Sequence, residues 1–283
     1  KGFTDRKKAD VVPADKKPWL RADLEDKPDK GFPESHLYDF TATGYESIMV
    51  GVFGILTNVP VTNESPKVID LKFGFSRDGY NYERPVHDPF VWSSRNPQSW
   101  HRGYLHPASG VCLIVGDKLY FYFGAWSGDS PTLGTHVYAG GCTGLVTLRR
   151  DGFAAMEAGE SEGSLTTKPV IFNGKYPFVN VETQNGELRM EILNEKGKVI
   201  APFTKENCVP IKTDKTKQKI EWKGGQDLSK LAGKPVIFKF YLSNGKLYSF
   251  WVSPDLSGAS YGYVAAGGPG YKGSTDTTGG LDK

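Results

Sequence analysis

Short apolar runs that end at glycine-containing turns follow one another along most of this chain. The runs Val111 to Val115 and Leu119 to Phe123 flank the pair Gly116-Asp117, and such pairs supply the backbone conformation that a tight hairpin needs. Three later turns have the sequence Asn-Gly, at Asn173-Gly174, Asn185-Gly186 and Asn244-Gly245. This pattern predicts antiparallel sheets and an all-β fold. Helix signals occur at Asp227 to Ala232, where an N-cap aspartate precedes Gly233.

The spacing of these runs predicts four parts. Residues 1–36 are rich in charge and proline, with a few aromatic side chains, and are predicted to be an extended docking segment. Residues 37–157 read strand after strand, with Ile48 to Leu56 as a buried strand and Val68 to Ser76 as a half-buried one. Residues 160–255 hold short alternating strands typical of a β-sandwich. The Gly, Ser and Thr content of residues 256–283 predicts a flexible tail.

Two segments of the second part resemble each other. Phe75 to Tyr80 and Leu148 to Phe153 each end a strand in Arg-Asp-Gly followed by an aromatic residue. We interpret them as two copies of a blade-like unit of a β-propeller, each extended by a long loop. The aspartates of both copies, Asp78 and Asp151, are predicted to be turn residues.

Composition and motifs exclude several classes of protein. The formal charge of +3 is too small to favour nucleic-acid binding, and no apolar run is long enough to cross a membrane. Three cysteines make no disulfide framework, and no C-x-x-C pair is present. P-loop, α/β-hydrolase and zincin motifs do not occur, and Gly140-Gly141 precedes a strand rather than a helix. We therefore expect neither a cofactor nor a metal.

The strongest candidate for acid–base chemistry is Tyr45-Glu46-Ser47, directly before the buried strand. A carboxyl group at the mouth of an apolar strand is desolvated, which raises its pKa towards the range of a general acid. The alternative is a glutamate at the rim, in water or in a structural salt bridge. Cys142 is interpreted as a small packed residue, because no histidine and acid can be assigned to it as partners.

A second candidate region is the loop from Asp88 to His106, which is rich in aromatic and basic side chains. Aromatic faces stack on sugar rings, and Arg and His donate hydrogen bonds to hydroxyl groups. The same residues also suit a plain aromatic-capped loop. The spacing of the two histidines matches no standard metal-ligand pair. The predicted sugar-binding residues are Tyr45, Trp92, Arg95, Trp100, His101, Tyr104 and His106.

With these motifs in view, the chain resembles the C-terminal part of a five-bladed β-propeller glycosidase of the invertase and arabinanase type, with a C-terminal β-sandwich. The motifs that carry the resemblance are Leu37-Tyr38-Asp39-Phe40, Tyr45-Glu46-Ser47, Gly74 to Gly79, Val115 to Tyr122, Thr143 to Phe153 and Leu247 to Trp251.

The resemblance implies a general-acid role for Glu46, because Tyr45-Glu46 matches the aromatic-Glu part of a family motif in which Cys is usual where Ser47 stands. The family's two catalytic aspartates belong to motifs that do not occur here, so they are expected upstream of Lys1. Within the chain, Asp39 is the candidate to substitute for the second carboxylate. Residues 37–157 provide about two blades, too few to close a propeller. We therefore expect a fragment, or a second polypeptide that supplies the other blades.

These observations predict a glycoside hydrolase, or the larger part of one, that cleaves a glycan by paired-carboxylate chemistry. The alternative is a non-catalytic glycan-binding or structural protein on the same scaffold. The partner is a carbohydrate in both cases, with no nucleic acid and no membrane insertion. The resemblance implies an extracellular, periplasmic or cell-surface location.

Overall fold

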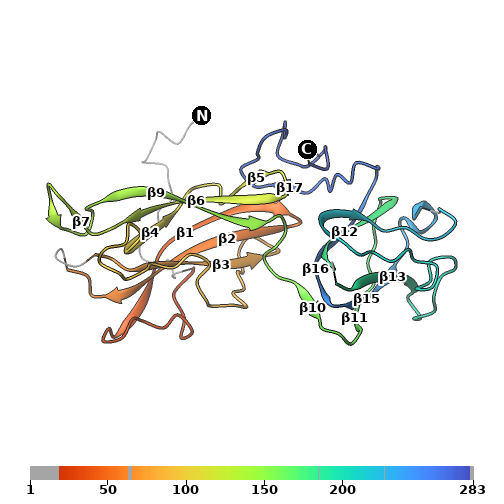
Figure 1. Ribbon diagram of the computed structural model, residues 1–283, viewed down its shortest axis with the longest axis horizontal. Coiled ribbons are helices and arrows are strands. Elements are labelled where there is room, and N and C mark those ends of the chain that lie inside the picture. Colours follow the sequence, from red (N-terminus) through yellow and green to blue (C-terminus); the bar gives the residue numbers. More distant parts are fainter. Residues whose placement is uncertain (1–18, 63–65, 184, 226, 281–283) are drawn as a thin grey trace.

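Antiparallel strands make up the regular structure of this protein in a computed structural model that describes residues 19–62, 66–183, 185–225 and 227–280 (Figure 1). The predicted all-β class is confirmed. Within these residues the one helical element is a 3-10 turn, η1 (Ser229–Leu231). It occupies the predicted helical stretch, where the Asp227 carboxylate accepts a hydrogen bond from the amide of Ser229. No described helix has the length and hydropathy of a membrane span.

The first sheet has the order β17-β1-β2-β3 among the described strands. These are β1 (Glu34–Glu46), β2 (Ile48–Val59), β3 (Ile69–Ser76) and β17 (Tyr263–Val264). The long strands β1 and β2 form a hairpin in which Tyr45 lies opposite Ile48. The interior of β2 is buried on both faces, as its unbroken apolar sequence predicts.

The strand β3 is buried on both faces as well, so the prediction of a half-buried strand is wrong. Its polar side chains Asp70 and Lys72 are only 4% and 5% exposed. Lys72 lies 2.9 Å from Asp26, and Asp70 lies 2.7 Å from Arg95. Both partners come from segments outside the sheet that cover this face, which an alternating pattern alone does not reveal.

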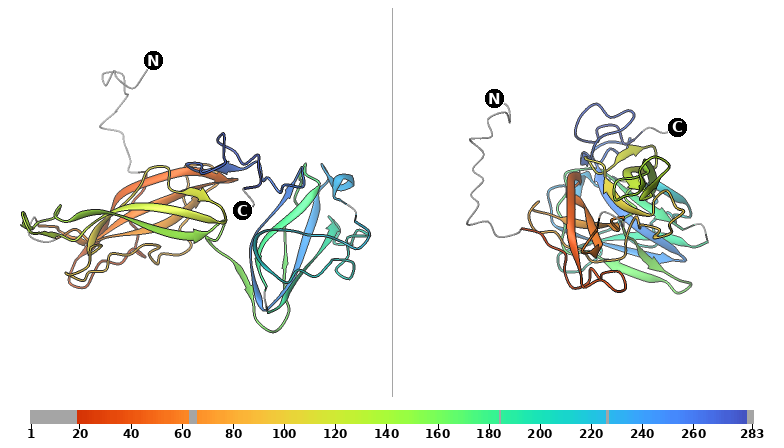
Figure 2. Two further views of the ribbon diagram at one scale, coloured as in Figure 1. Left: turned by 45° about the horizontal axis from the view of Figure 1, so that its top comes forward. Right: turned by 90° about the vertical axis from the view of Figure 1, so that its left-hand side faces the viewer.

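The second sheet is built around β6 (Lys118–Trp126), the central strand. Among the described strands, β4 (Gly103–Pro107) and β5 (Leu113–Val115) pair with one edge of β6, and β9 (Gly141–Arg149) pairs with the other. A small hairpin, β7 (Asp129–Ser130) and β8 (Gly134–Thr135), extends from the end of β6. The first two sheets lie against each other (Figure 2). They share one core, in which Ile69, Leu105, Ile114 and Leu119 are fully buried.

Two further sheets pack face to face in the C-terminal half. The described strands of one are β10 (Met156–Ala158), β16 (Gly245–Ser253), β12 (Tyr176–Glu182) and β14 (Asp214–Lys219), in that order. The other has the order β11 (Gly163–Thr166), β15 (Val236–Ser243) and β13 (Glu187–Asn194). Side chains from both, including Val179, Leu188 and Phe238, form a separate core. This arrangement is a β-sandwich.

The described part of the C-terminal tail packs against the first sheet, where a flexible tail was predicted. It leaves β16, crosses back and adds β17 to the edge of β1 (Figure 1). Ala259 and Val264 are 0% and 1% exposed. The prediction is therefore wrong for this segment: its many glycines form turns with positive φ, such as Gly258 and Gly267, between buried contacts.

The N-terminal docking segment is described from residue 19, and residues 1–18 lie outside the described part of the chain. Trp19 stacks on Tyr80, with ring centroids 5.7 Å apart, and its indole N–H donates to the Tyr80 carbonyl at 2.8 Å. Regular structure begins with β1 at Glu34, within the segment that was predicted to be extended.

Candidate functional site

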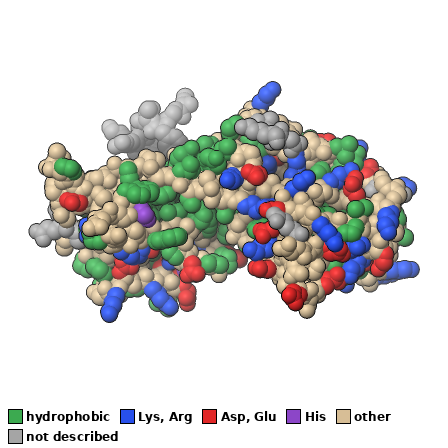
Figure 3. Space-filling model, in the orientation of Figure 1, with side chains coloured by type: hydrophobic (Ala, Val, Ile, Leu, Met, Phe, Trp, Pro, Cys, Tyr) green, Lys and Arg blue, Asp and Glu red, His purple; other side chains and the backbone are tan. Residues whose placement is uncertain are grey.

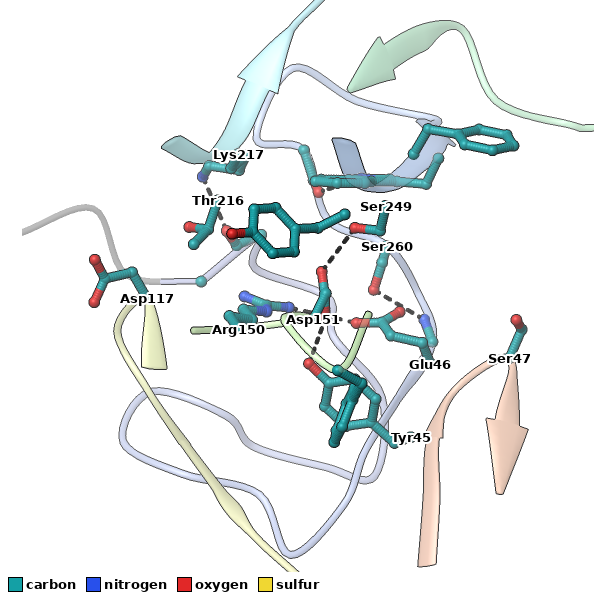
Figure 4. A pocket seen from close by; sticks show the side chains of 18 of the residues that line it. Tyr45, Glu46, Ser47, Asp117, Arg150, Asp151, Thr216, Lys217, Ser249 and Ser260 are labelled. Carbon is teal, nitrogen blue, oxygen red and sulfur yellow. Dashed lines mark hydrogen bonds and ion pairs between the residues drawn. The ribbon is translucent and has the colours of Figure 1, made fainter. Parts of the chain in front are cut away.

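A cleft of about 1380 Å³ lies where the first two sheets, the sandwich and the C-terminal segment meet. Its walls come from the end of β1, the turn after β9, the strands β14 and β16, and residues 258–280 (Figure 4). In Figure 4 the side chains of Tyr45, Arg150, Ser249 and Ser260 lie around Glu46 and Asp151. These segments are far apart in the chain, so the cleft is a product of the tertiary fold.

Glu46 occupies the tight turn between β1 and β2 and has a left-handed backbone, with φ of +50°. A left-handed conformation is unfavourable for a non-glycine residue and is often found at functional sites. The turn directs the Glu46 carboxyl group into the cleft, next to Arg150 and Asp151 (Figure 4). The neighbouring residues Tyr45 and Ser47 line the same cleft.

Asp151 lies in the turn that follows β9, and it also has a left-handed backbone, with φ of +55°. The hydroxyl of Tyr45 donates a hydrogen bond to its Oδ1. The hydroxyl of Ser249, on β16, donates to its Oδ2 at 3.2 Å. Donors from two different sheets thus hold both oxygens of this carboxylate in place (Figure 4).

Arg150 places a positive charge beside these acids. Its Nη2 lies 3.5 Å from Glu46 Oε1 and 2.8 Å from Asp276 Oδ2. The guanidinium is 12% exposed and the Asp276 side chain is 1% exposed. One arginine therefore stands among the carboxyl groups of Glu46, Asp151 and Asp276, and this excess of negative charge favours a proton on one of the acids.

Glu46 is the carboxyl group of this cleft whose pKa is raised far above its ordinary value. Burial and the charge of Asp151 raise its pKa to about 7, against the lowering effect of a hydrogen bond with Ser260 and the charge of Arg150. Burial would also raise the pKa of Asp276, but hydrogen bonds from Arg150 and backbone amides bring it below its ordinary value. Burial and Asp151 raise the pKa of Tyr45, so its hydroxyl stays a donor. Near neutral pH, Glu46 can therefore release a proton beside a second carboxyl group.

The remaining predicted sugar-binding residues lie elsewhere. None of Trp92, Arg95, Trp100, His101, Tyr104 and His106 is among the described residues that line the cleft. Tyr104 packs against Tyr38, near the start of β1, whereas Tyr45 is at its end. At about 3.3 Å per strand residue these two ends are roughly 20 Å apart. The structure thus separates two regions that the sequence analysis combined into one pocket.

Arg95 is engaged in ion pairs rather than directed into a pocket. Its Nη2 lies 2.9 Å from Asp29 Oδ1 and 2.7 Å from Asp70 Oδ2. These contacts attach the N-terminal segment to the buried strand β3. In this structure Arg95 therefore joins parts of the scaffold.

Tyr104 and His106 belong to a cluster around Lys67. The Lys67 ammonium lies 4.5 Å and 4.6 Å from the ring centres of Tyr38 and Tyr104, and it donates to the Tyr38 hydroxyl at 2.7 Å. His106 Nδ1 lies 2.5 Å from Asp39 Oδ2. Asp39 was the predicted substitute for the second carboxylate. It pairs with this histidine instead, away from Glu46, so that prediction is wrong.

The two tryptophans and His101 lie on the surface of the same half. Trp92 and Trp100 are 61% and 49% exposed. Trp100 stacks on Phe123 with centroids 6.0 Å apart, and His101 Nδ1 lies 2.8 Å from the Ser99 hydroxyl. On the face seen in Figure 3, hydrophobic side chains gather over the half built from the first two sheets, and charged side chains over the sandwich.

The sequence analysis missed Arg150, Asp151, Ser249 and Asp276. Asp151 was predicted to be a turn residue, which its backbone confirms, but its side chain and that of Arg150 also line the cleft. The available signal was the repeat itself, since two Arg-Asp-Gly copies invite comparison of the two aspartates. Ser249 and Asp276 carried no local signal.

A group of three residues has the spacing of a metal site: Asp23, Asp26 and His87, whose ligand atoms lie within 4.8 Å of one another. Protein cations already contact both acids. Arg84 reaches both Asp23 and Asp26, and Lys72 lies 2.9 Å from Asp26. A bound cation would have to compete with these charges, so the donor set does not fit a metal.

No family model matches the chain, and no curated protein matches it. Among solved structures, the chain is similar to a glycoside hydrolase family 43 arabinoxylan arabinofuranohydrolase from Bacillus subtilis, determined in complex with cellotetraose. The identity is 10% and the TM-score 0.25, over 76% of this chain and 53% of that one. The chain thus spans about half the length of that structure. A similarity this low carries no functional inference, which leaves the geometry of the cleft.

Proposed function

We propose that this chain carries the acid–base site of a glycoside hydrolase, with Glu46 as the general acid and Asp151 as the second carboxylate. The observation that carries the proposal is the pairing of these two carboxyl groups in one cleft with different surroundings. Glycoside hydrolysis ordinarily uses two carboxyl groups beside the scissile bond, one that protonates the leaving oxygen and one that acts as nucleophile or base.

The surroundings of each group suit its role. Burial and the charge of Asp151 raise the pKa of Glu46 to about 7, so it holds a proton to donate near neutral pH. Asp151 accepts hydrogen bonds from Tyr45 and Ser249, which orient it towards the cleft. These donors also replace water around the carboxylate. In this proposal the second carboxylate comes from within the chain, whereas the sequence analysis expected it upstream of Lys1.

The wider setting is part of the same proposal. The sequence resemblance supports a partial five-bladed propeller followed by a β-sandwich, with a glycan substrate. It also supports an extracellular, periplasmic or cell-surface location, and further blades from upstream sequence or from a second polypeptide. The cleft supports the chemistry, and the choice of sugar depends on walls that such blades would contribute.

The direct experiment compares Glu46→Gln with wild type on two substrates of one sugar, a nitrophenyl glycoside and an alkyl glycoside. Loss of a general acid typically costs 10²- to 10⁴-fold in rate. The loss should be larger for the alkyl glycoside, because a poor leaving group depends more on protonation. A Glu46→Gln rate within a few-fold of wild type on both substrates contradicts the assignment.

A non-catalytic glycan-binding function is the second candidate, and the exposure of Trp92 and Trp100 away from the carboxyl pair favours it. Exposed aromatic rings stack on sugars without any acid–base chemistry. Binding to a glycan array should then survive Glu46→Gln and disappear in Trp92→Ala or Trp100→Ala. Equal binding by all three variants contradicts this function.

A further inference from the structure

The C-terminal segment makes direct contact with Glu46. Glu46 lies opposite Tyr263 in the pairing of β1 with β17, and the Ala265 amide donates to the Gly44 carbonyl at 3.0 Å. A Cβ atom on Gly262 would lie 2.1 Å from Glu46 Oε2, so the close approach of this segment to the carboxyl group requires a glycine at this position. This segment therefore forms one wall of the acid's surroundings.

Asp276 is the buried acid of this segment, and every oxygen of its carboxylate has a donor. Oδ2 accepts from Arg150 at 2.8 Å, and Oδ1 accepts from the amides of Thr278 and Gly279 at 3.0 and 2.8 Å. Its own amide donates to the Gly262 carbonyl at 2.9 Å. Asp276 is thus fixed in position, and it fixes the guanidinium of Arg150.

We propose that Asp276 is a positioning residue that holds Arg150 away from full pairing with Glu46, so that Glu46 keeps its proton. Arg150 Nη2 lies 2.8 Å from Asp276 and 3.5 Å from Glu46, so the guanidinium is shared unequally between the two acids. The consequence for catalysis rests on the proposed function. The effect on the proton of Glu46 stands without it.

Several titratable groups surround Glu46. The turn after β9 contributes Arg150 and Asp151, β1 contributes Tyr45, and the C-terminal segment contributes Asp276 and Tyr271. Across the cleft lie charged groups of the β5–β6 turn and of the sandwich, namely Asp117, Asp214, Lys215 and Lys217. Among the cations of the described residues, it is Arg150 that lies within ion-pair distance of Glu46.

Neutralising Asp276 should therefore act on Glu46 in one direction. In Asp276→Asn the guanidinium of Arg150 loses its closest anionic partner and becomes available to Glu46, and a negative charge near Glu46 disappears. Both changes favour the ionised form of Glu46 and lower its pKa. A carboxyl group next to an available arginine typically has a pKa lowered by about 1–3 units.

The experiment is a ¹³C NMR titration of the whole chain labelled at glutamate side chains, in which the resonance missing from Glu46→Gln identifies Glu46. We expect a midpoint near 7 in wild type, and a midpoint lower by about 1–2 pH units in Asp276→Asn. An unchanged midpoint in folded Asp276→Asn overturns the proposal.

Two further variants separate the Arg150 route from a general disturbance of the cleft. In Arg150→Met/Asp276→Asn the arginine is gone, so the Glu46 midpoint should return to the wild-type value or above. If the double variant keeps the low midpoint, Arg150 does not transmit the effect and the proposal fails. Ser260→Ala removes a hydrogen bond that lowers the pKa of Glu46, so its midpoint should rise, opposite to Asp276→Asn.

Activity distinguishes this inference from the proposed function. With a working hydrolase, the basic limb of the pH–rate profile of Asp276→Asn should move to lower pH by the same amount as the Glu46 midpoint. If the midpoint moves as expected and wild type hydrolyses no glycoside, the positioning role of Asp276 stands and the hydrolase function falls. If activity is present and its basic limb does not move while the midpoint does, Glu46 is not the acid.

Discussion

Two turns of this chain have the same sequence, Arg-Asp-Gly followed by an aromatic residue, yet their aspartates have different partners. Asp78 binds within its own turn: it accepts hydrogen bonds from the amides of Tyr80 and Asn81 and from the hydroxyl of Ser76. Asp151 accepts from Tyr45 on β1 and from Ser249 on β16. The same short motif thus gives a turn-stabilising residue in one place and a cleft residue in the other.

The difference follows from what surrounds each turn. The turn of Asp78 is at the surface, and backbone hydrogen bonds from Asn81 and Tyr80 hold the pKa of Asp78 well below its ordinary value. The turn of Asp151 faces a cleft whose walls come from the sandwich and the C-terminal segment. Donors that are distant in sequence therefore reach the Asp151 carboxylate, which changes the role that it can have.

The largest expected effect separates the two aspartates by activity. Asp151→Asn should lower the rate of glycoside hydrolysis by at least about 10²-fold, because it removes one of the paired carboxylates. Asp78→Asn is the matched control and should stay within a few-fold of wild type. The measurement is kcat/KM of both variants on the same substrate. Equal losses of kcat/KM in the two variants would show that the two aspartates do not differ in role.

The next effect concerns the pH dependence of stability that Glu46 creates beside the turn of Asp151. Because the pKa of Glu46 is raised from 4.5 to about 7, the folded protein binds more protons than the unfolded chain between these values, and its free energy of unfolding falls as the pH rises through them. The fall attributable to Glu46 is about 3 kcal/mol.

Urea denaturation at pH 4.5 and pH 8 measures this dependence. Glu46→Gln should remove it, so the variant gains on wild type at the higher pH. The first turn provides the control, since Asp78→Asn should leave the fall between these two pH values in place. A fall that persists unchanged in Glu46→Gln would show that another group causes it.

The smallest effect distinguishes the two glycines. Gly79 has φ of +74°, and an added Cβ would meet only Met49 Cγ at 3.8 Å, so Gly79→Ala should cost about 1 kcal/mol of backbone strain and leave activity unchanged. At Gly152 the added Cβ would lie 2.8 Å from the carbonyl oxygen of Arg149. Gly152→Ala should therefore shift the turn that carries Asp151.

Denaturation midpoints and kcat/KM for both alanine variants test this pair. We expect a loss of stability in each variant and a loss of activity in Gly152→Ala alone. An active Gly152→Ala would mean that the hydrogen bonds from Tyr45 and Ser249 keep the Asp151 carboxylate in position even when its turn is displaced.

Much of the fold could be predicted because strand and turn signals are local. The turns at Asn185-Gly186 and Asn244-Gly245, the unbroken apolar run of β2 and, within the described residues, the helical turn at Ser229–Leu231 lie where the sequence indicates them. The turn predicted at Asn173-Gly174 is absent, and this pair lies in an irregular segment before β12. The exceptions in burial have a common cause. Strand β3 and the C-terminal segment are less exposed than predicted, because they contact residues that are remote in sequence.

The candidate site divides in the same way. The sequence by itself determined that Glu46 stands at the mouth of a buried strand, since the apolar run that marks the strand is a local pattern. Only the tertiary structure decided that Asp151, Arg150 and Asp276 meet Glu46, and that Tyr104 and His106 do not. The physical reason is that desolvation and ion pairing depend on distances between residues that the chain brings together only when its sheets pack.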